Sequence, residues 1–116
     1  MFDESCVFCR VVGGKAQAAM LHRDEHVVAF RDIRPMAPIH ILVVPTGHLA
    51  SLNEVTEADE PLLAHMLRVA RELAVREHVD AKGYRIVINT GPEAGQSVSH
   101  LHLHLLAGRP MSWPPG

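Results

Sequence analysis

Apolar residues recur at strand spacing in several short segments of the chain and at helical spacing in one long segment. Alternating or β-branched apolar runs predict five strands, at residues 20–23, 26–31, 39–44, 84–89 and 100–107. The turn pair Asp24-Glu25 separates the first two and predicts a β-hairpin. Residues 32–38 are expected to form a loop, because Pro35 and Pro38 fix the backbone and remove donors.

The long segment begins at Thr56, where Thr56-Glu57-Ala58-Asp59 is similar to a capping box with acidic residues in the first turn. Two neighbouring apolar stripes follow and predict a helix that runs to about His78, with its broad apolar face against a sheet. The stripes are Leu62, Met66, Val69 and Leu73, and Leu63, Leu67, Ala70 and Ala74. A shorter helix of one or two turns is expected at residues 5–12, before Gly13-Gly14.

Five strands in mostly hairpin-like succession and one long helix predict an α+β fold with an antiparallel sheet. No repeat or linker divides the 116 residues, so we expect a single domain over residues 1–116. A hydrophobic fraction of 47% with 21% charged residues excludes a disordered chain. The net charge of −2 excludes a mainly electrostatic nucleic-acid binder. Apolar runs are too short to span a membrane, and Asp3 and Glu4 stand where a secretory signal carries bases, so we expect a cytoplasmic protein.

Histidine is unusually abundant, with nine residues, and three of them lie in His100-Leu101-His102-Leu103-His104-Leu105-Leu106. In a strand these three imidazoles would share one face at intervals of roughly 6.6 Å, which brackets a phosphate-sized group, while the leucines face the core. Phosphoryl chemistry, metal chelation by His-x-His and a solvent-exposed polar face are all compatible with this pattern. The glycine-containing segment 91–99 leads into the strand and favours phosphoryl chemistry, because glycines let backbone N–H groups approach an anion and Gln96 and Ser97 add donors.

The only two cysteines form a Cys-x-x-Cys pair, Cys6 and Cys9. This spacing is compatible with zinc binding, with a redox pair and with two buried thiols. A zinc site needs two further ligands from elsewhere in the fold, and His48 and His100 are available.

The histidine strand fits the His-φ-His-φ-His-φ-φ pattern of the histidine triad (HIT) superfamily. Further segments make nearly the whole chain resemble the Hint branch, the histidine triad nucleotide-binding proteins. They are Phe30-Arg31-Asp32-Ile33 with Pro35, Pro38 and His40; Leu42-Val43-Val44-Pro45; Asn89; Gly95-Gln96-Ser97-Val98; and the ending Gly108-Arg109-Pro110-Met111-Ser112-Trp113-Pro114-Pro115-Gly116.

The resemblance implies a homodimer whose sheet continues across the interface, binding of purine nucleotides such as AMP, and hydrolysis of adenosine 5′-monophosphoramidates through a nucleotidyl intermediate on His102. It implies that His104 donates to a phosphate oxygen, that His40 orients and polarises His102, and that Ser97 assists the departing amine. A neutral imidazole is a good nucleophile near pH 7. The implied nucleotide-binding residues are Phe30, Asp32, Ile33, Asn89, Gly95, Gln96, Ser97, Val98, His102, His104 and Trp113.

The resemblance also implies a structural zinc ion on Cys6, Cys9, His48 and His100, with no cofactor needed for catalysis. Ser99 departs from the bulky aromatic residue that relatives often carry there. Two other functions stay open: hydrolysis of diadenosine polyphosphates, which the ending at residues 108–116 disfavours, and nucleotide binding or scaffolding with minor catalysis. Trp113 is expected at or across the dimer interface. The remaining histidines, His22, His26, His65 and His78, are expected on the surface.

Overall fold

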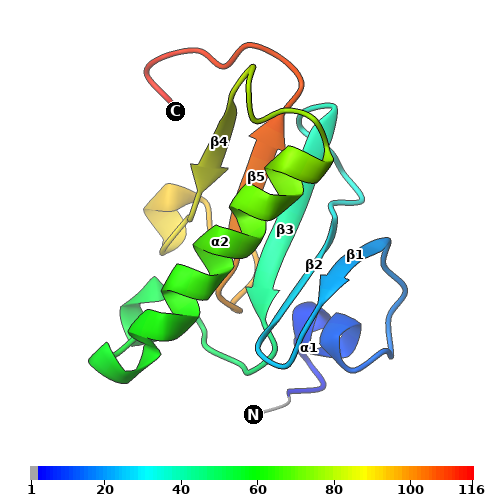
Figure 1. Cartoon of the computed structure of the whole chain (residues 1–116). Coiled ribbons are helices and arrows are strands. Elements are labelled where there is room, and N and C mark those ends of the chain that lie inside the picture. Colours follow the sequence, from blue (N-terminus) through cyan, green and yellow to red (C-terminus); the bar gives the residue numbers. More distant parts are fainter. Residues whose placement is uncertain (1–2) are drawn as a thin grey trace.

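The structure, a computed structural model, describes residues 3–116 and has the predicted α+β architecture (Figure 1). All strand pairs of the five-stranded sheet are antiparallel, and the strand order is β1-β2-β3-β5-β4. The strands are β1 (Met20–Arg23), β2 (Val27–Arg31), β3 (Ile39–Pro45), β4 (Tyr84–Val87) and β5 (Leu103–Ala107), and the helices are α1 (Val7–Val12) and α2 (Glu60–Arg76). Within the described part of the chain, no helix is both long and apolar enough to cross a membrane.

The two helices pack on opposite faces of the sheet, and this explains why β2 and β3 are buried along almost their whole length. On one face, Val27, Ala29 and Ile41 pack against α2. On the other face, Val28 and Phe30 pack against α1. Strands covered on both faces read as continuous apolar runs rather than as an alternation, as residues 41–44 do.

Helix α2 begins after a single 3-10 turn, Glu57–Asp59, and Thr56 and Asp59 form the predicted capping box. One apolar stripe is buried or half-buried as expected, but Leu67 on the second stripe is 48% exposed. The buried face is therefore narrower than predicted. The helix ends at Arg76, two residues before the expected end at His78, which is exposed.

The last strand is shorter than the sequence predicts, because β5 begins at Leu103 rather than at residue 100. The backbone of the preceding residues bonds elsewhere: the N–H of Leu101 donates to the carbonyl of Leu49, and the carbonyl of His100 accepts from the imidazole of His102. The alternation of faces nevertheless continues through this segment. Leu101, Leu103 and Leu105 enter the core under α2, whereas the three histidines lie on the opposite face. Strand β4 also ends earlier than expected, at Val87 instead of Asn89.

Candidate functional site

His102 lies at the buried end of a pocket of about 430 Å³ on the α1 side of the sheet. Its ring packs edge-on against Phe8 of α1, with 5.1 Å between the ring centroids. Its Nδ1 lies 2.7 Å from the carbonyl oxygen of His100. A carbonyl can only accept, so Nδ1 carries the proton, and Nε2 of a neutral His102 keeps its lone pair. Burial lowers the pKa of His102, which favours the neutral ring at neutral pH.

A second chain of contacts fixes the tautomers of His40 and His104. The backbone N–H of Met36 donates to Nδ1 of His40 over 3.0 Å, so the proton of a neutral His40 is on Nε2. That Nε2 lies 2.9 Å from Nδ1 of His104 and donates to it, which leaves the proton of His104 on its own Nε2. Burial, reinforced by the nearby His102 and His40, lowers the pKa of His104 to about 4. His104 is therefore a neutral donor at neutral pH.

The contacts of His40 bear on its predicted role in a relay to His102. Nε2 of His40 bonds to His104, and the carbonyl of His100 holds the ring of His102. Asp32 completes the group, with Oδ2 placed 3.4 Å from Nε2 of His40. Its other carboxylate oxygen accepts from the backbone N–H of Arg34, which fixes the loop at the pocket edge.

The pocket brings together most of the residues that were expected to bind a nucleotide. It is lined by the predicted Phe30, Asp32, Ile33, Ser97, Val98, His40, His102 and His104. Ile33 is 86% exposed at the rim and Phe30 is buried, so the pocket offers an apolar wall that leads inward to the imidazoles. Sequence reasoning missed Phe8, Leu42 and Met36, which also line the pocket. Their apolar side chains carry no signal that separates them from ordinary core residues.

Four predicted nucleotide-binding residues do not line this pocket: Asn89, Gly95, Gln96 and Trp113. The amide of Gln96 is engaged in the loop itself, where it accepts from the N–H of Gly91 and donates to the carbonyls of Ala50 and Val98. Its role is to hold the loop beside the pocket. Trp113 is 81% exposed, and the carbonyl of its neighbour Ser112 accepts from Arg85 of β4, which keeps the tail beside the outer strand.

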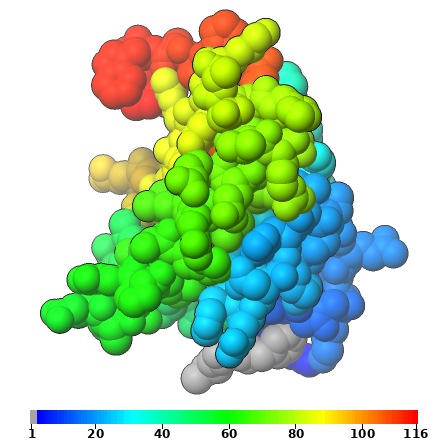
Figure 2. Space-filling view, in the orientation of Figure 1, coloured from blue at the N-terminus to red at the C-terminus, as the bar shows by residue number. Residues whose placement is uncertain are grey.

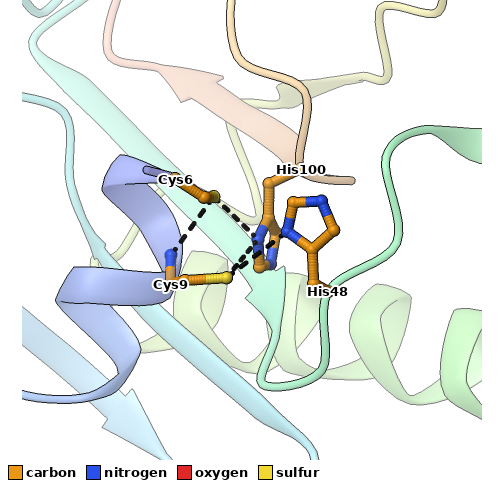
Figure 3. Close-up of side chains that lie close together, drawn as sticks. All are labelled: Cys6, Cys9, His48 and His100. Atoms are coloured by element: carbon orange, nitrogen blue, oxygen red, sulfur yellow. Dashed lines mark hydrogen bonds between the residues drawn. The ribbon is translucent and has the colours of Figure 1, made fainter. Parts of the chain in front are cut away.

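Next to His102, on the side of α1, Cys6, Cys9, His48 and His100 bring four metal-ligating atoms together (Figure 3). Nδ1 of His100 lies 3.3 Å from Sγ of Cys6 and 3.6 Å from Sγ of Cys9, and Nδ1 of His48 lies 3.3 Å from Sγ of Cys9. Tetrahedral zinc with ordinary bond lengths separates sulfur and nitrogen ligands by about 3.6 Å. Nε2 of His100 donates to the carbonyl of Pro45, an outer contact that aims Nδ1 at the thiols. The donor set therefore fits a closed four-ligand metal site.

Comparison with known proteins identifies the class to which this fold and site belong. The family model described as the scavenger mRNA decapping enzyme C-terminal binding region matches residues 5–113. An uncharacterized HIT-like protein of Synechococcus elongatus is 44% identical over 98% of this chain and 99% of its own. The 14 kDa zinc-binding protein of Zea mays is 42% identical over 98% of this chain and 90% of its own. The chain belongs to the histidine triad (HIT) superfamily.

Among solved structures, a HIT family hydrolase from Legionella pneumophila superposes with a TM-score of 0.94 and 47% identity. The match covers 96% of this chain and 99% of that one. The fold expected from the sequence is confirmed over nearly its whole length.

Proposed function

We propose that this protein hydrolyses nucleoside 5′-phosphoramidates, with purine nucleosides as the expected class, through a covalent intermediate on His102. The observation that carries the proposal is the pairing of two buried imidazoles with opposite roles. Nδ1 of His102 donates to the His100 carbonyl, so its Nε2 is a free nucleophile, whereas Nδ1 of His104 accepts from His40, so its Nε2 is a donor. Their ring centroids are 5.0 Å apart. One phosphoryl group can contact both.

In the proposed reaction, Nε2 of His102 attacks the α-phosphorus and a nitrogen–phosphorus bond forms as the bond to the amine breaks. The departing amine takes up one proton from solvent, and we assign the hydroxyl of Ser97, at the pocket edge, to relay it and to end unchanged. Water then attacks the same phosphorus and the nitrogen–phosphorus bond breaks. The nucleoside monophosphate and one proton are released, and His102 returns to its neutral form. His104 donates to a nonbridging phosphate oxygen through both steps. Two easier displacements replace one difficult one.

The residues that line the pocket would bind the nucleoside part of the substrate. Asp32 would accept from the ribose hydroxyls, and Phe30 and Ile33 would flank the base. We also propose that Asn89, Gly95 and Gln96 contribute to nucleotide binding by shaping the loop beside the pocket. Trp113 would contribute from a second copy of the chain. The predicted homodimer, with a sheet continued across its interface, belongs to this proposal.

We further propose that Cys6, Cys9, His48 and His100 hold one zinc ion, which supplies structure and takes no part in the reaction. The ion would link α1 to the segment before β5, and so fix Phe8 against His102. The site has four protein ligands and no open position, which is typical of structural zinc. The 42% sequence identity between this chain and the 14 kDa zinc-binding protein of Zea mays supports this assignment.

A substrate panel tests the proposed activity. Adenosine and guanosine phosphoramidates with different amines, and a diadenosine polyphosphate, are offered to the wild type and to His102→Ala. We expect turnover of the phosphoramidates to exceed that of the dinucleotide, and His102→Ala to lose at least about 1,000-fold in kcat. Faster hydrolysis of the dinucleotide would support the other hydrolase class. Nucleotide binding without turnover of any compound would support a binding protein.

A further inference from the structure

Two histidines expected to be ordinary surface residues converge on one carboxylate, outside the pocket and the cysteine cluster. Nε2 of His22 on β1 lies 2.6 Å from Oδ2 of Asp24, and Nε2 of His65 on α2 lies 2.7 Å from the same oxygen. Figure 2 shows the hairpin of β1 and β2, in blue to cyan, pressed along the flank of α2, in green. The three side chains thus join the hairpin turn to the helix.

The turn itself holds the Asp24 carboxylate in place, independently of the two imidazoles. Oδ1 of Asp24 accepts from the backbone N–H of His26 over 2.8 Å and from that of Val27 over 2.9 Å. Oδ2 is thereby left to face His22 and His65. Burial opposes ionisation of Asp24, but the four hydrogen bonds outweigh it and hold the pKa of this carboxyl far below its usual range. Asp24 is therefore an anionic oxygen ligand with a fixed direction.

The three side chains are accessible from solvent and close enough to bind a single ion. Their ligand atoms all lie within 4.8 Å of one another. The side chains of His22, Asp24 and His65 are 23%, 31% and 27% exposed. His65 also borders an open pocket of about 520 Å³, through which solvent reaches it.

We propose that His22, Asp24 and His65 form a second metal site, which binds one divalent transition-metal ion such as Zn²⁺. Two imidazole nitrogens with one carboxylate oxygen favour such ions over Mg²⁺ or Ca²⁺, which prefer oxygen ligands alone. In the metal-bound form each imidazole coordinates through Nε2 and carries its proton on Nδ1, so the ion takes the place of the two hydrogen bonds to Oδ2 of Asp24. Three protein ligands leave a position for water.

The two nitrogen–oxygen separations require only a small adjustment. Bonds of 2.0–2.1 Å at angles between 90° and 109° separate neighbouring ligand atoms by about 2.9–3.3 Å. The present nitrogen–oxygen separations are 2.6 and 2.7 Å. The imidazoles must therefore move outward by roughly half an ångström, and their partial exposure provides the room.

Metal stoichiometry tests the proposal on the full chain, with Zn²⁺ and Co²⁺ as probes. In equilibrium dialysis against excess Zn²⁺, we expect the wild type to retain one more equivalent than His22→Gln or His65→Gln. Glutamine at position 65 can still donate to Asp24, so the fold is kept. His26→Gln is the matched control, because His26 is exposed on the same turn and its imidazole is outside the cluster. It should bind as much zinc as the wild type.

Cobalt separates the two sites spectroscopically, because only the cysteine site gives thiolate-to-cobalt charge-transfer absorption. We expect the wild type and His26→Gln to bind more equivalents of Co²⁺ than the charge-transfer absorption accounts for. In His22→Gln and His65→Gln this additional bound Co²⁺ should be absent. Added Zn²⁺ should also raise the Tm of the wild type beyond the first equivalent, and not that of these two variants. Equal stoichiometry in the wild type and His65→Gln, or equal loss in His26→Gln, would overturn the proposal.

Discussion

Replacing His104 by glutamine should make the stability of this protein less sensitive to acid. His104 is half-buried on β5, and its pKa is lowered to about 4 from an ordinary value of 6.5. Burial is the main cause, with further contributions from His102 and His40 that Asp32 partly offsets. As the pH falls below 6.5, the unfolded chain therefore takes up a proton at this position before the folded chain does.

The sign of the effect follows from this order of protonation. The stabilisation linked to a neutral His104 is fully present above about pH 6.5 and is lost as the pH falls toward 4. With one pKa unit equal to about 1.4 kcal/mol, the loss between pH 7 and pH 5 is about 2 kcal/mol of the free energy of unfolding. Glutamine cannot titrate, but its side-chain oxygen can still accept from Nε2 of His40, so the variant removes the titration and keeps the hydrogen bond.

Urea unfolding at about pH 7 and pH 5, followed by far-ultraviolet circular dichroism, measures this difference. Between the two pH values the wild type should lose about 2 kcal/mol more than His104→Gln. The two proteins differ only at position 104, so the comparison isolates the pH dependence that depends on the imidazole of His104. If both proteins lose the same free energy of unfolding between the two pH values, the inference that burial lowers the pKa of His104 is wrong.

Three further changes test other parts of the structure. Gly108→Ala should lower the free energy of unfolding by about 1–3 kcal/mol, because φ is +95° and the new Cβ would lie 2.8 Å from Cβ of Pro38. Urea unfolding measures this loss. Gly83→Ala, also at positive φ but with no neighbour within 4 Å of the new Cβ, should lose less. Cys6→Ser should lose the bound zinc, and about 3 kcal/mol of stability when free zinc is 100-fold above the wild-type Kd; metal analysis and thermal unfolding check this. Truncation after Met111 should alter the preference among amine leaving groups while changing stability by less than about 0.5 kcal/mol; the substrate panel and urea unfolding check this.

Periodicity predicted helix α2 and the last strand well, because each of them turns one apolar face toward the core under α2. The alternation of leucine and histidine placed Leu101, Leu103 and Leu105 in the core, and the Thr56–Asp59 pair marked the start of the helical segment. Periodicity overestimated the length of the last strand. It indicates on which face each side chain lies, and this alternation continues before Leu103, where the backbone no longer makes the hydrogen bonds of the sheet. The backbone hydrogen bond from Leu101 to Leu49 and the bond between the His100 carbonyl and the imidazole of His102 show that this segment bonds outside the sheet.

The residues of the site could be predicted from the sequence, but not the hydrogen bonds that they make with one another. The triad pattern located His102 and His104, whereas the pairing of His40 with His104 depends on a backbone donor from the proline-containing loop, Met36. Nothing in the sequence indicates that His22 and His65 lie close together. They are 43 positions apart by number, and only the packing of the hairpin on α2 brings both to Asp24.

In the proposed reaction, Nε2 of His102 forms a covalent bond to phosphorus, and this bond can be detected directly. Wild-type protein is mixed with excess adenosine phosphoramidate, quenched rapidly in denaturant near neutral pH, and mapped by peptide mass spectrometry. We expect one adenylyl group on the peptide that contains His102, formed no more slowly than steady-state turnover, and none in His102→Ala. Turnover without any adduct, or an adduct on another histidine, would contradict it.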